Sequence, residues 1–192
     1  IASASIQRIS EFEPRHLSNL IWTFAKLKSS DSQFRLVECV AYAFQRCVEH
    51  ADRQGLANAA WAFATLLWHD RPLMTAIWTE SRRKISSFTS QHVANSTWAF
   101  AKLEVFDMLL MKALSNASMP LMKDFGTQGL VNMLWAVAKL SYEDVTLVDA
   151  LSATAMEMMA EMSTVDLANL AWAHTTLTCR DEVFLNAVAT RA

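Results

Sequence analysis

Apolar and polar residues follow one pattern that returns five times along the chain. Its anchor is a tryptophan, with an asparagine three residues before it, an aliphatic residue five before it and a leucine five after it. The five copies read LSNLIWTFAKL at 17–27, LANAAWAFATL at 56–66, VANSTWAFAKL at 93–103, LVNMLWAVAKL at 130–140 and LANLAWAHTTL at 167–177. Successive tryptophans are 39, 37, 37 and 37 residues apart. Self-similarity at this period indicates stacked units that bury their apolar faces against one another.

Each copy predicts a helix, and the residues that follow it predict a second helix. The residues eight before each tryptophan include Ser90, Thr127 and Thr164, which are good N-caps, and Pro14, which suits a first helical turn. Nine residues after each tryptophan stands an aspartate, which we interpret as the cap of the second helix rather than as part of a metal or catalytic array. These aspartates are Asp31, Asp70, Asp107, Asp144 and Asp181. The unit is therefore a helical hairpin, with a helix A of about 14 residues and a helix B of about 16.

The predicted fold is all-α, an α-solenoid of about five stacked hairpins that forms a single helical-repeat domain over residues 1–192. Ile9 and Phe12 match Ile85 and Phe88 in register, so residues 1–13 are interpreted as the tail of a preceding repeat. The repeats are expected at 14–52, 53–89, 90–126, 127–163 and 164–192. Analogy with related solenoids predicts a right-handed superhelix with the A helices on its inner surface.

The aromatic residues of helix A are interpreted as core. This prediction includes both the recurrent tryptophan and the phenylalanine two residues after it, as in Trp61 and Phe63. An alternative use of the tryptophans, as platforms on which nucleobases stack, is less favoured. His174 stands where the other copies have Phe or Val, and we expect it in the core or at an interface.

Composition narrows the function classes. An apolar fraction of 53% with 19% charged residues excludes a disordered chain. Three glycines and three prolines favour briefly connected helices over a strand-rich fold. A net charge of −2 excludes a strongly basic arm, and no apolar stretch is long enough for a transmembrane segment. Three cysteines are too few for a disulfide framework or a zinc site. Without a glycine-rich phosphate loop or histidines at metal spacing, we predict no enzyme, no catalytic residue, no cofactor, no metal and no small-molecule substrate.

The repeat resembles the octotricopeptide repeat family and, more distantly, the FAST-kinase-like proteins. The segments SQHVANSTWAFAKL at 90–103 and TQGLVNMLWAVAKL at 127–140 carry the resemblance most closely, and it extends over almost the whole chain. Members of that family are mostly organellar proteins that bind particular RNAs and act in RNA maturation, stability, translation or ribosome assembly. The resemblance implies a location in a chloroplast or mitochondrion and a partner that is single-stranded RNA or ribosomal RNA.

One side of helix A has the chemistry that RNA contacts need. The positions seven and three before the tryptophan, and one and four after it, lie on one stripe, and none of these positions holds an acid. Amides can pair with base edges, and Lys or Arg can contact phosphates. The candidate RNA-binding residues are Arg15, Asn19, Lys26, Gln54, Asn58, Gln91, Asn95, Lys102, Gln128, Asn132, Lys139 and Asn169. For the asparagines the structural alternative is a ladder that ties neighbouring A helices together. The basic run 82–84 is a further candidate phosphate site.

Two functions remain open on this basis. The first is RNA binding by the inner face of the A helices, whose five segments contain five cations and one acid, Asp166. The second is a protein-binding scaffold in a large organellar assembly, such as a ribosome or a respiratory or photosynthetic complex. The chain is expected to start and finish within a repeat, so apolar end faces would need to be covered, either by further repeats or by other protein subunits.

Overall fold

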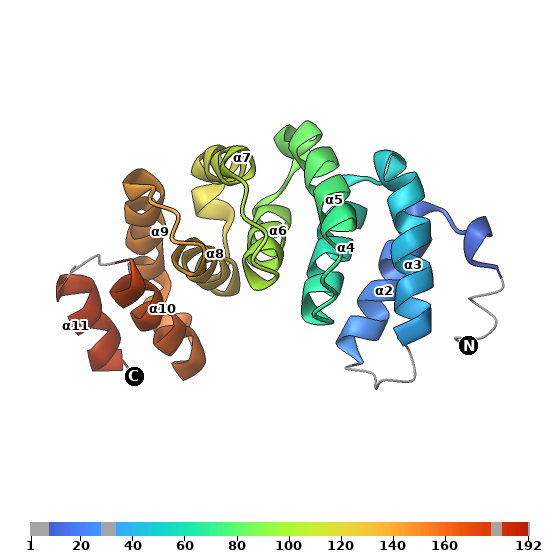
Figure 1. The fold of residues 1–192 in the computed structure, drawn as a ribbon. Helices are drawn as coiled ribbons and strands as arrows, with labels where there is room; N and C mark the ends of the chain where they lie inside the picture. The colour runs from blue at the N-terminus through green and yellow to red at the C-terminus, as the bar shows by residue number, and fades with distance from the viewer. Residues whose placement is uncertain (1–7, 28–33, 178–181, 192) are drawn as a thin grey trace. The chain divides into compact units, whose positions relative to one another are not determined.

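A computed structural model of the chain describes residues 8–27, 34–177 and 182–191. Over these residues the protein has ten α-helices and no strand, which confirms the predicted all-α helical-repeat class (Figure 1). The chain divides into two compact units, residues 1–87 and 88–192. No helix in the described ranges combines the length and the apolar character that crossing a membrane requires.

The five A helices share one length and begin at one register position. They are α2 (Pro14–Lys26), α4 (Arg53–Thr65), α6 (Ser90–Lys102), α8 (Thr127–Lys139) and α10 (Thr164–Thr176), each of 13 residues. The predicted N-caps were wrong by one position, because Ser90, Thr127 and Thr164 are the first helical residues. The residue before each helix has the extended backbone of a cap, and Asp52, for example, accepts a hydrogen bond from the Gly55 amide at 2.7 Å.

The B helices begin at the predicted aspartates wherever these are described. They are α3 (Phe34–Cys47), α5 (Arg71–Arg83), α7 (Met108–Ser118), α9 (Val145–Met158) and α11 (Glu182–Arg191). The carboxylates of Asp70, Asp107 and Asp144 accept the backbone N–H three residues on at 2.9–3.0 Å, so the capping interpretation is confirmed for these three. Asp31 and Asp181 lie outside the described residues.

Short 3₁₀ turns follow the B helices and link each hairpin to the next. They are η3 (Val48–His50), η4 (Ile85–Ser87), η5 (Met119–Asp124) and η6 (Met159–Glu161), and η1 (Ile9–Glu11) precedes α2 as η4 precedes α6. In residues 1–87 the Arg53 guanidinium donates to the Ser87 carbonyl at 2.8 Å, and in residues 88–192 the Ser90 hydroxyl donates to the Asp124 carbonyl at 2.8 Å. Both bonds join the first residue of an A helix to the turn 34 residues later. Each bond therefore joins the start of a helix A to the turn at the end of its own hairpin.

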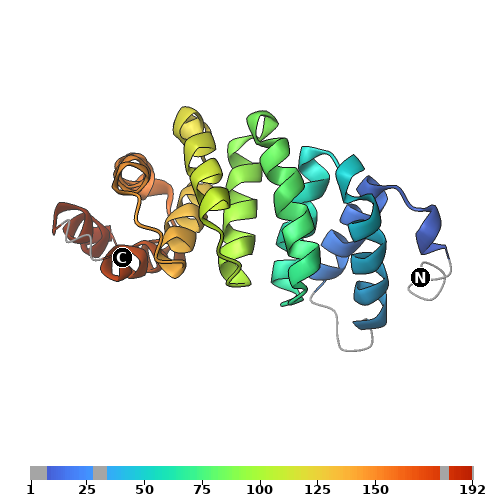
Figure 2. The same ribbon diagram turned by 45° about the horizontal axis from the view of Figure 1, so that its top comes forward.

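Within each unit the A helices pack directly against one another. In residues 1–87, α2 lies beside α4 and α3 lies beside α5 (Figure 2). In residues 88–192, α8 contacts both α6 and α10. Small residues permit the close approach: a Cβ on Gly55 would lie 3.4 Å from the Ser18 hydroxyl oxygen, and one on Gly129 would lie 3.7 Å from the Ala94 methyl. Helix α4 also buries five of its alanines completely: Ala57, Ala59, Ala60, Ala62 and Ala64.

The core contains the predicted phenylalanines, whereas the prediction that the tryptophans are core was wrong in part. Phe63 and Phe100 are fully buried. Trp22 and Trp172, in contrast, are 38% and 41% exposed, and the other three repeat tryptophans are partly exposed. Residues two apart on a helix point about 200° from each other, so both cannot face the same core. The phenylalanine takes the inward position and the tryptophan lies at the edge of the packed surface.

His174 takes the inward position of Phe in α10. It is buried, and its ring stacks on that of Phe184 with centroids 3.7 Å apart and planes 9° from parallel. Its Nε2 lies 3.0 Å from the Ser152 hydroxyl and its Nδ1 lies 3.2 Å from the Leu170 carbonyl oxygen. The expectation of a core histidine is therefore confirmed.

Three A helices are followed, two residues after their last helical residue, by a residue with a left-handed backbone. Leu67, Glu104 and Ser141 have φ of 53°, 55° and 49°. The amide of the following residue donates to the carbonyl five positions earlier, as from Trp68 to Phe63 at 2.9 Å. This is the Schellman arrangement, which satisfies the last carbonyls of a helix and turns the chain toward the B helix.

The different placement of two aromatic residues on α2 can be tested by stability measurements. We expect Phe24→Ala to lower the free energy of unfolding by about 3–5 kcal/mol, because it leaves a cavity at a site that is 8% exposed. Trp22→Ala should cost clearly less, because part of the ring already contacts water. Urea denaturation of the two variants measures both values. Equal losses would place Trp22 in the core.

Candidate nucleic-acid interface

The structure places most of the predicted RNA-binding residues on an accessible side of the A helices. The residues seven before the tryptophan and four after it are exposed, namely Arg15, Gln54, Gln91, Gln128, Lys26, Lys102 and Lys139. Among the asparagines, Asn19 is exposed, and Asn58, Asn95, Asn132 and Asn169 are partly buried. The structure thus brings the candidates of each helix onto one side, and whether they bind RNA stays a prediction.

One position of the predicted stripe does not belong to it. The residue after the tryptophan is alanine in four of the A helices, and all four alanines are completely buried. The tryptophan itself, at i+3 from the asparagine and i−4 from the lysine position, lies on the same side as the exposed candidates. We therefore define the A-helix strip as the positions seven and three before the tryptophan, the tryptophan, and four after it. Sequence reasoning missed the tryptophan because it assigned this residue to the core.

The amides of the strip are paired within their own helix in two repeats. The Gln54 side chain donates to Asn58 Oδ1 at 2.8 Å, and the Gln128 side chain donates to Asn132 Oδ1 at 3.0 Å. The two residues are one turn apart, so the bond holds both amides side by side. Each pair presents further donors and acceptors at the surface, which is the chemistry that base edges recognise.

Neighbouring tryptophans of the strip touch one another. In residues 1–87 the ring centroids of Trp22 and Trp61 are 6.4 Å apart with planes tilted by 44°. In residues 88–192 Trp135 lies 6.4 Å from Trp98 and 6.2 Å from Trp172, with tilts of 37° and 32°. These separations are those of aromatic pairs in contact. We call these rows the tryptophan ladder; it has two members in the first unit and three in the second.

The cations of the strip interact with the ladder and with nearby acids. The Lys26 ammonium lies 5.4 Å from the Trp22 ring centroid and 5.0 Å from that of Trp61, within the range of cation–π attraction. The Lys139 ammonium lies 2.9 Å from a carboxylate oxygen of Glu104, the left-handed residue after α6. Since both side chains are substantially exposed, this pair contributes little to stability, and another anion can replace the carboxylate.

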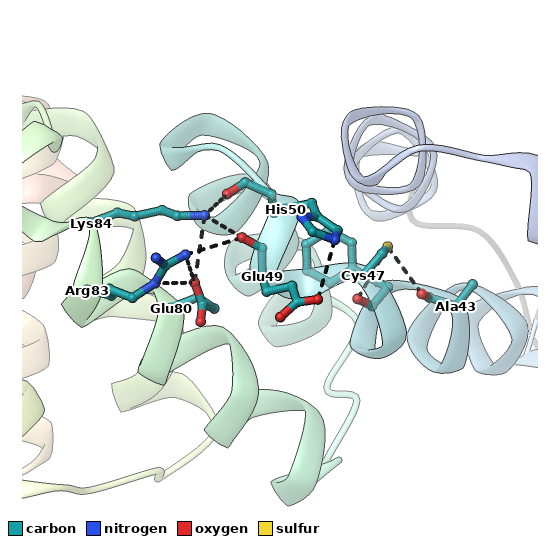
Figure 3. Close-up of polar contacts among 9 residues, drawn as sticks. Ala43, Cys47, Glu49, His50, Glu80, Arg83 and Lys84 are labelled. Atoms are coloured by element: carbon teal, nitrogen blue, oxygen red, sulfur yellow. Dashed lines mark hydrogen bonds and ion pairs between the residues drawn. The ribbon is translucent and has the colours of Figure 1, made fainter.

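The basic run 82–84 makes structural contacts, and its interpretation as a candidate phosphate site stays a prediction. The Lys84 ammonium donates to the carbonyls of Glu49 and Ala51 at 2.8 and 2.6 Å, as Figure 3 shows for the first of these. The Arg83 guanidinium binds the Glu80 carboxylate at 2.8 Å (Figure 3), and that of Arg82 lies 5.1 Å from the Trp78 ring centroid. Lys84 therefore satisfies two backbone carbonyls at turn η3, which ends the preceding hairpin.

The groups with a shifted pKa are structural as well. Burial raises the pKa of the Cys47 thiol, whose Sγ lies 3.3 Å from the Ala43 carbonyl oxygen, so the thiol stays protonated (Figure 3). Burial, reinforced by the charge of Asp144, raises the pKa of Tyr142. Asp144 also accepts a hydrogen bond from the Ser115 hydroxyl at 2.6 Å, which joins α7 to the cap of α9. Among the described residues no group of three or more His, Cys, Asp or Glu side chains is placed to hold a metal ion.

Part of the chain matches a protein-family model. Residues 88–182, just under half of the chain, match the family model described as RNA-editing substrate-binding complex 6 protein. This segment contains α6, α8 and α10, the three A helices of the second unit. The chain is thus similar, over that segment, to a family named for an RNA-editing complex, and the octotricopeptide identification itself stays a prediction. No curated protein matches the chain.

The structural role of Lys84 leads to a stability prediction. We expect Lys84→Met to lower the free energy of unfolding by about 1–3 kcal/mol, because the carbonyls of Glu49 and Ala51 lose a charged donor. Lys123→Met, at an exposed position, serves as the control and should change stability by less than about 0.5 kcal/mol. Thermal or urea unfolding of both variants measures the difference. If Lys84→Met is as stable as the control, the contacts of Lys84 with these carbonyls do not contribute to the free energy of unfolding.

Proposed function

We propose that the protein is a non-enzymatic RNA-binding module that contacts single-stranded RNA through the A-helix strip. The observation that carries the proposal is the composition of this strip, which has amides, tryptophans and lysines at accessible positions and no acid at any of its 20 positions. The family match supports it, because the matching family is named for binding the substrate of RNA editing. A role within an RNA-associated complex of an organelle agrees with both.

Different positions of the strip contribute different contacts to RNA. Lys26, Lys102 and Lys139 are exposed ammonium groups that can pair with phosphates, which supplies affinity without regard to sequence. The Gln–Asn pairs offer donors and acceptors to base edges. An asparagine that recurs in all five repeats cannot distinguish one base from another, so sequence preference is expected from the residue seven before the tryptophan.

A protein-binding scaffold is the alternative, and one feature of the second unit favours it. Phe106 before α7 is 49% exposed, Met108 and Leu109 at the start of α7 are 56% and 59% exposed, and Val145 at the start of α9 is 73% exposed. Exposed apolar side chains of this size are typical of surfaces that contact another protein. None of these four residues belongs to the A-helix strip, so a protein partner that contacts them does not by itself occupy the strip positions.

Charge removal on the strip tests the proposed function. We expect the double variant Lys102→Ala/Lys139→Ala to bind a single-stranded RNA oligonucleotide at least about ten-fold more weakly at low salt, because two charge-assisted phosphate contacts are lost. The slope of log affinity against log salt should flatten by about 1.4, since each phosphate contact to a single strand contributes about 0.7. Fluorescence anisotropy at several salt concentrations measures both quantities.

The control removes the same charge elsewhere in the second unit. Lys112→Ala/Lys123→Ala changes two exposed lysines on α7 and η5. This variant should bind RNA within about two-fold of the affinity of the unchanged protein, with the same dependence on salt. Equal losses in the two double variants would mean that net charge alone drives binding. Absence of RNA binding by the unchanged protein at low salt would refute the proposed function.

The Glu104–Lys139 pair gives a prediction of the opposite sign. Glu104→Gln removes the carboxylate that competes with a phosphate for Lys139, so we expect RNA affinity to rise about two- to five-fold, with a steeper salt dependence. Glu157→Gln, at an exposed position of α9, removes the same charge far along the B helix and is the matched control. Affinities of both variants for one RNA oligonucleotide decide the matter. If Glu104→Gln binds no better than its control, Lys139 does not contact phosphate.

A further inference from the structure

The tryptophan ladder is the feature of the strip that packing explains least. In every A helix the residue two positions later fills the core, a phenylalanine in three helices, Val137 in α8 and His174 in α10, so the core does not need the tryptophan ring as well. A partly exposed indole leaves apolar area in contact with water. The ladder nevertheless repeats this arrangement in every A helix, with exposed fractions that reach 38% at Trp22 and 41% at Trp172.

We infer that the tryptophan ladder is a stacking surface for unpaired nucleobases. This inference rests on the proposed function and adds the binding mode and the substrate class, which is single-stranded rather than duplex RNA. Every nucleobase has a π face that can stack on an indole, whereas bases inside a duplex already stack on their neighbours. The ladder therefore selects for unpaired strands without selecting for a sequence.

The spacing of the rings sets how bases are held. Ring centroids at 6.2–6.4 Å with planes tilted by 32–44° belong to indoles that already touch, so a base does not insert between two members. Bases instead lie against the outward part of the ladder. Because successive members are in contact, the ladder offers a continuous apolar track within each unit, along which a strand can shift its register.

The surroundings of the ladder favour a nucleic acid over a polypeptide. A lysine stands one helical turn after Trp22, Trp98 and Trp135, where its ammonium can reach the phosphate that follows a stacked base. The asparagine one turn before the ring adds an amide at the opposite side. The absence of acids on the strip disfavours basic peptides, which also bind aromatic rings through cation–π contacts. Lys26 already lies over Trp22 and Trp61, which places a cation beside the ring faces.

The test separates stacking from charge by changing the probe and the protein in turn. The probes are an oligouridine of about 12 nucleotides and a ribose–phosphate strand of the same length without bases. The variants are Trp172→Leu, which removes the aromatic face at the most exposed member of the ladder, and Trp172→Phe, which keeps one. The control is Phe106→Leu, which removes an aromatic ring that is 49% exposed in the same unit but off the ladder.

We expect the unchanged protein to bind oligouridine at least about ten-fold more tightly than the abasic strand, with quenching of tryptophan fluorescence. Trp172→Leu should lose about five- to ten-fold in affinity for oligouridine and nothing for the abasic strand. Trp172→Phe should keep most of the affinity, and Phe106→Leu should match the unchanged protein. Circular dichroism and the unfolding midpoint establish that each variant is folded.

The outcomes distinguish failure of this inference from failure of the proposed function. If both strands bind equally, with steep salt dependence and no effect of Trp172→Leu, the protein binds RNA by its phosphates and the stacking role is refuted. If neither strand binds at low salt, the proposed function fails and the inference fails with it. Equal binding of a polyglutamate peptide of the same length would show a general polyanion surface, which also overturns the inference.

Discussion

The close packing of one A helix on the next is the constraint from which the other features follow. Fully buried alanines, and glycines at Gly55 and Gly129 where a Cβ would meet a neighbouring side chain, let the helices approach. At this distance the tryptophans of successive helices are in contact, and a ladder forms wherever the repeat places one indole per helix. Bulkier residues in the contact would separate the rings and with them the polar residues of the strip.

Periodicity predicted the hairpins well because it reflects burial, which is a property of each repeat on its own. The five A helices begin within one residue of the expected positions, and Asp70, Asp107 and Asp144 cap the B helices as their position after the tryptophan indicated. The helix caps were displaced by one residue because a cap and a first helical residue have similar side-chain preferences. Hydrogen-bond geometry, and not composition, separates the two positions.

The candidate site was less predictable because it depends on contacts between repeats. A tryptophan in an apolar helix is typical of a core residue. Only its direction around the helix axis, about 200° from the residue two positions later, shows that it lies at the edge of the packed surface. The run 82–84 reads as a phosphate site, yet the carbonyls that engage Lys84 belong to residues 33 and 35 positions earlier. Lys139 likewise meets Glu104 across the repeat boundary. Local sequence holds no signal for such partners.

The left-handed residues that follow three A helices have a consequence for engineering. A side chain in this backbone conformation costs about 1 kcal/mol or more, and glycine avoids that cost. Leu67 and Ser141 are exposed, so little packing would be lost on replacing them. An idealised repeat array built from this chain would lose backbone strain with glycine at these bends, and its hairpins could then be concatenated as interchangeable modules.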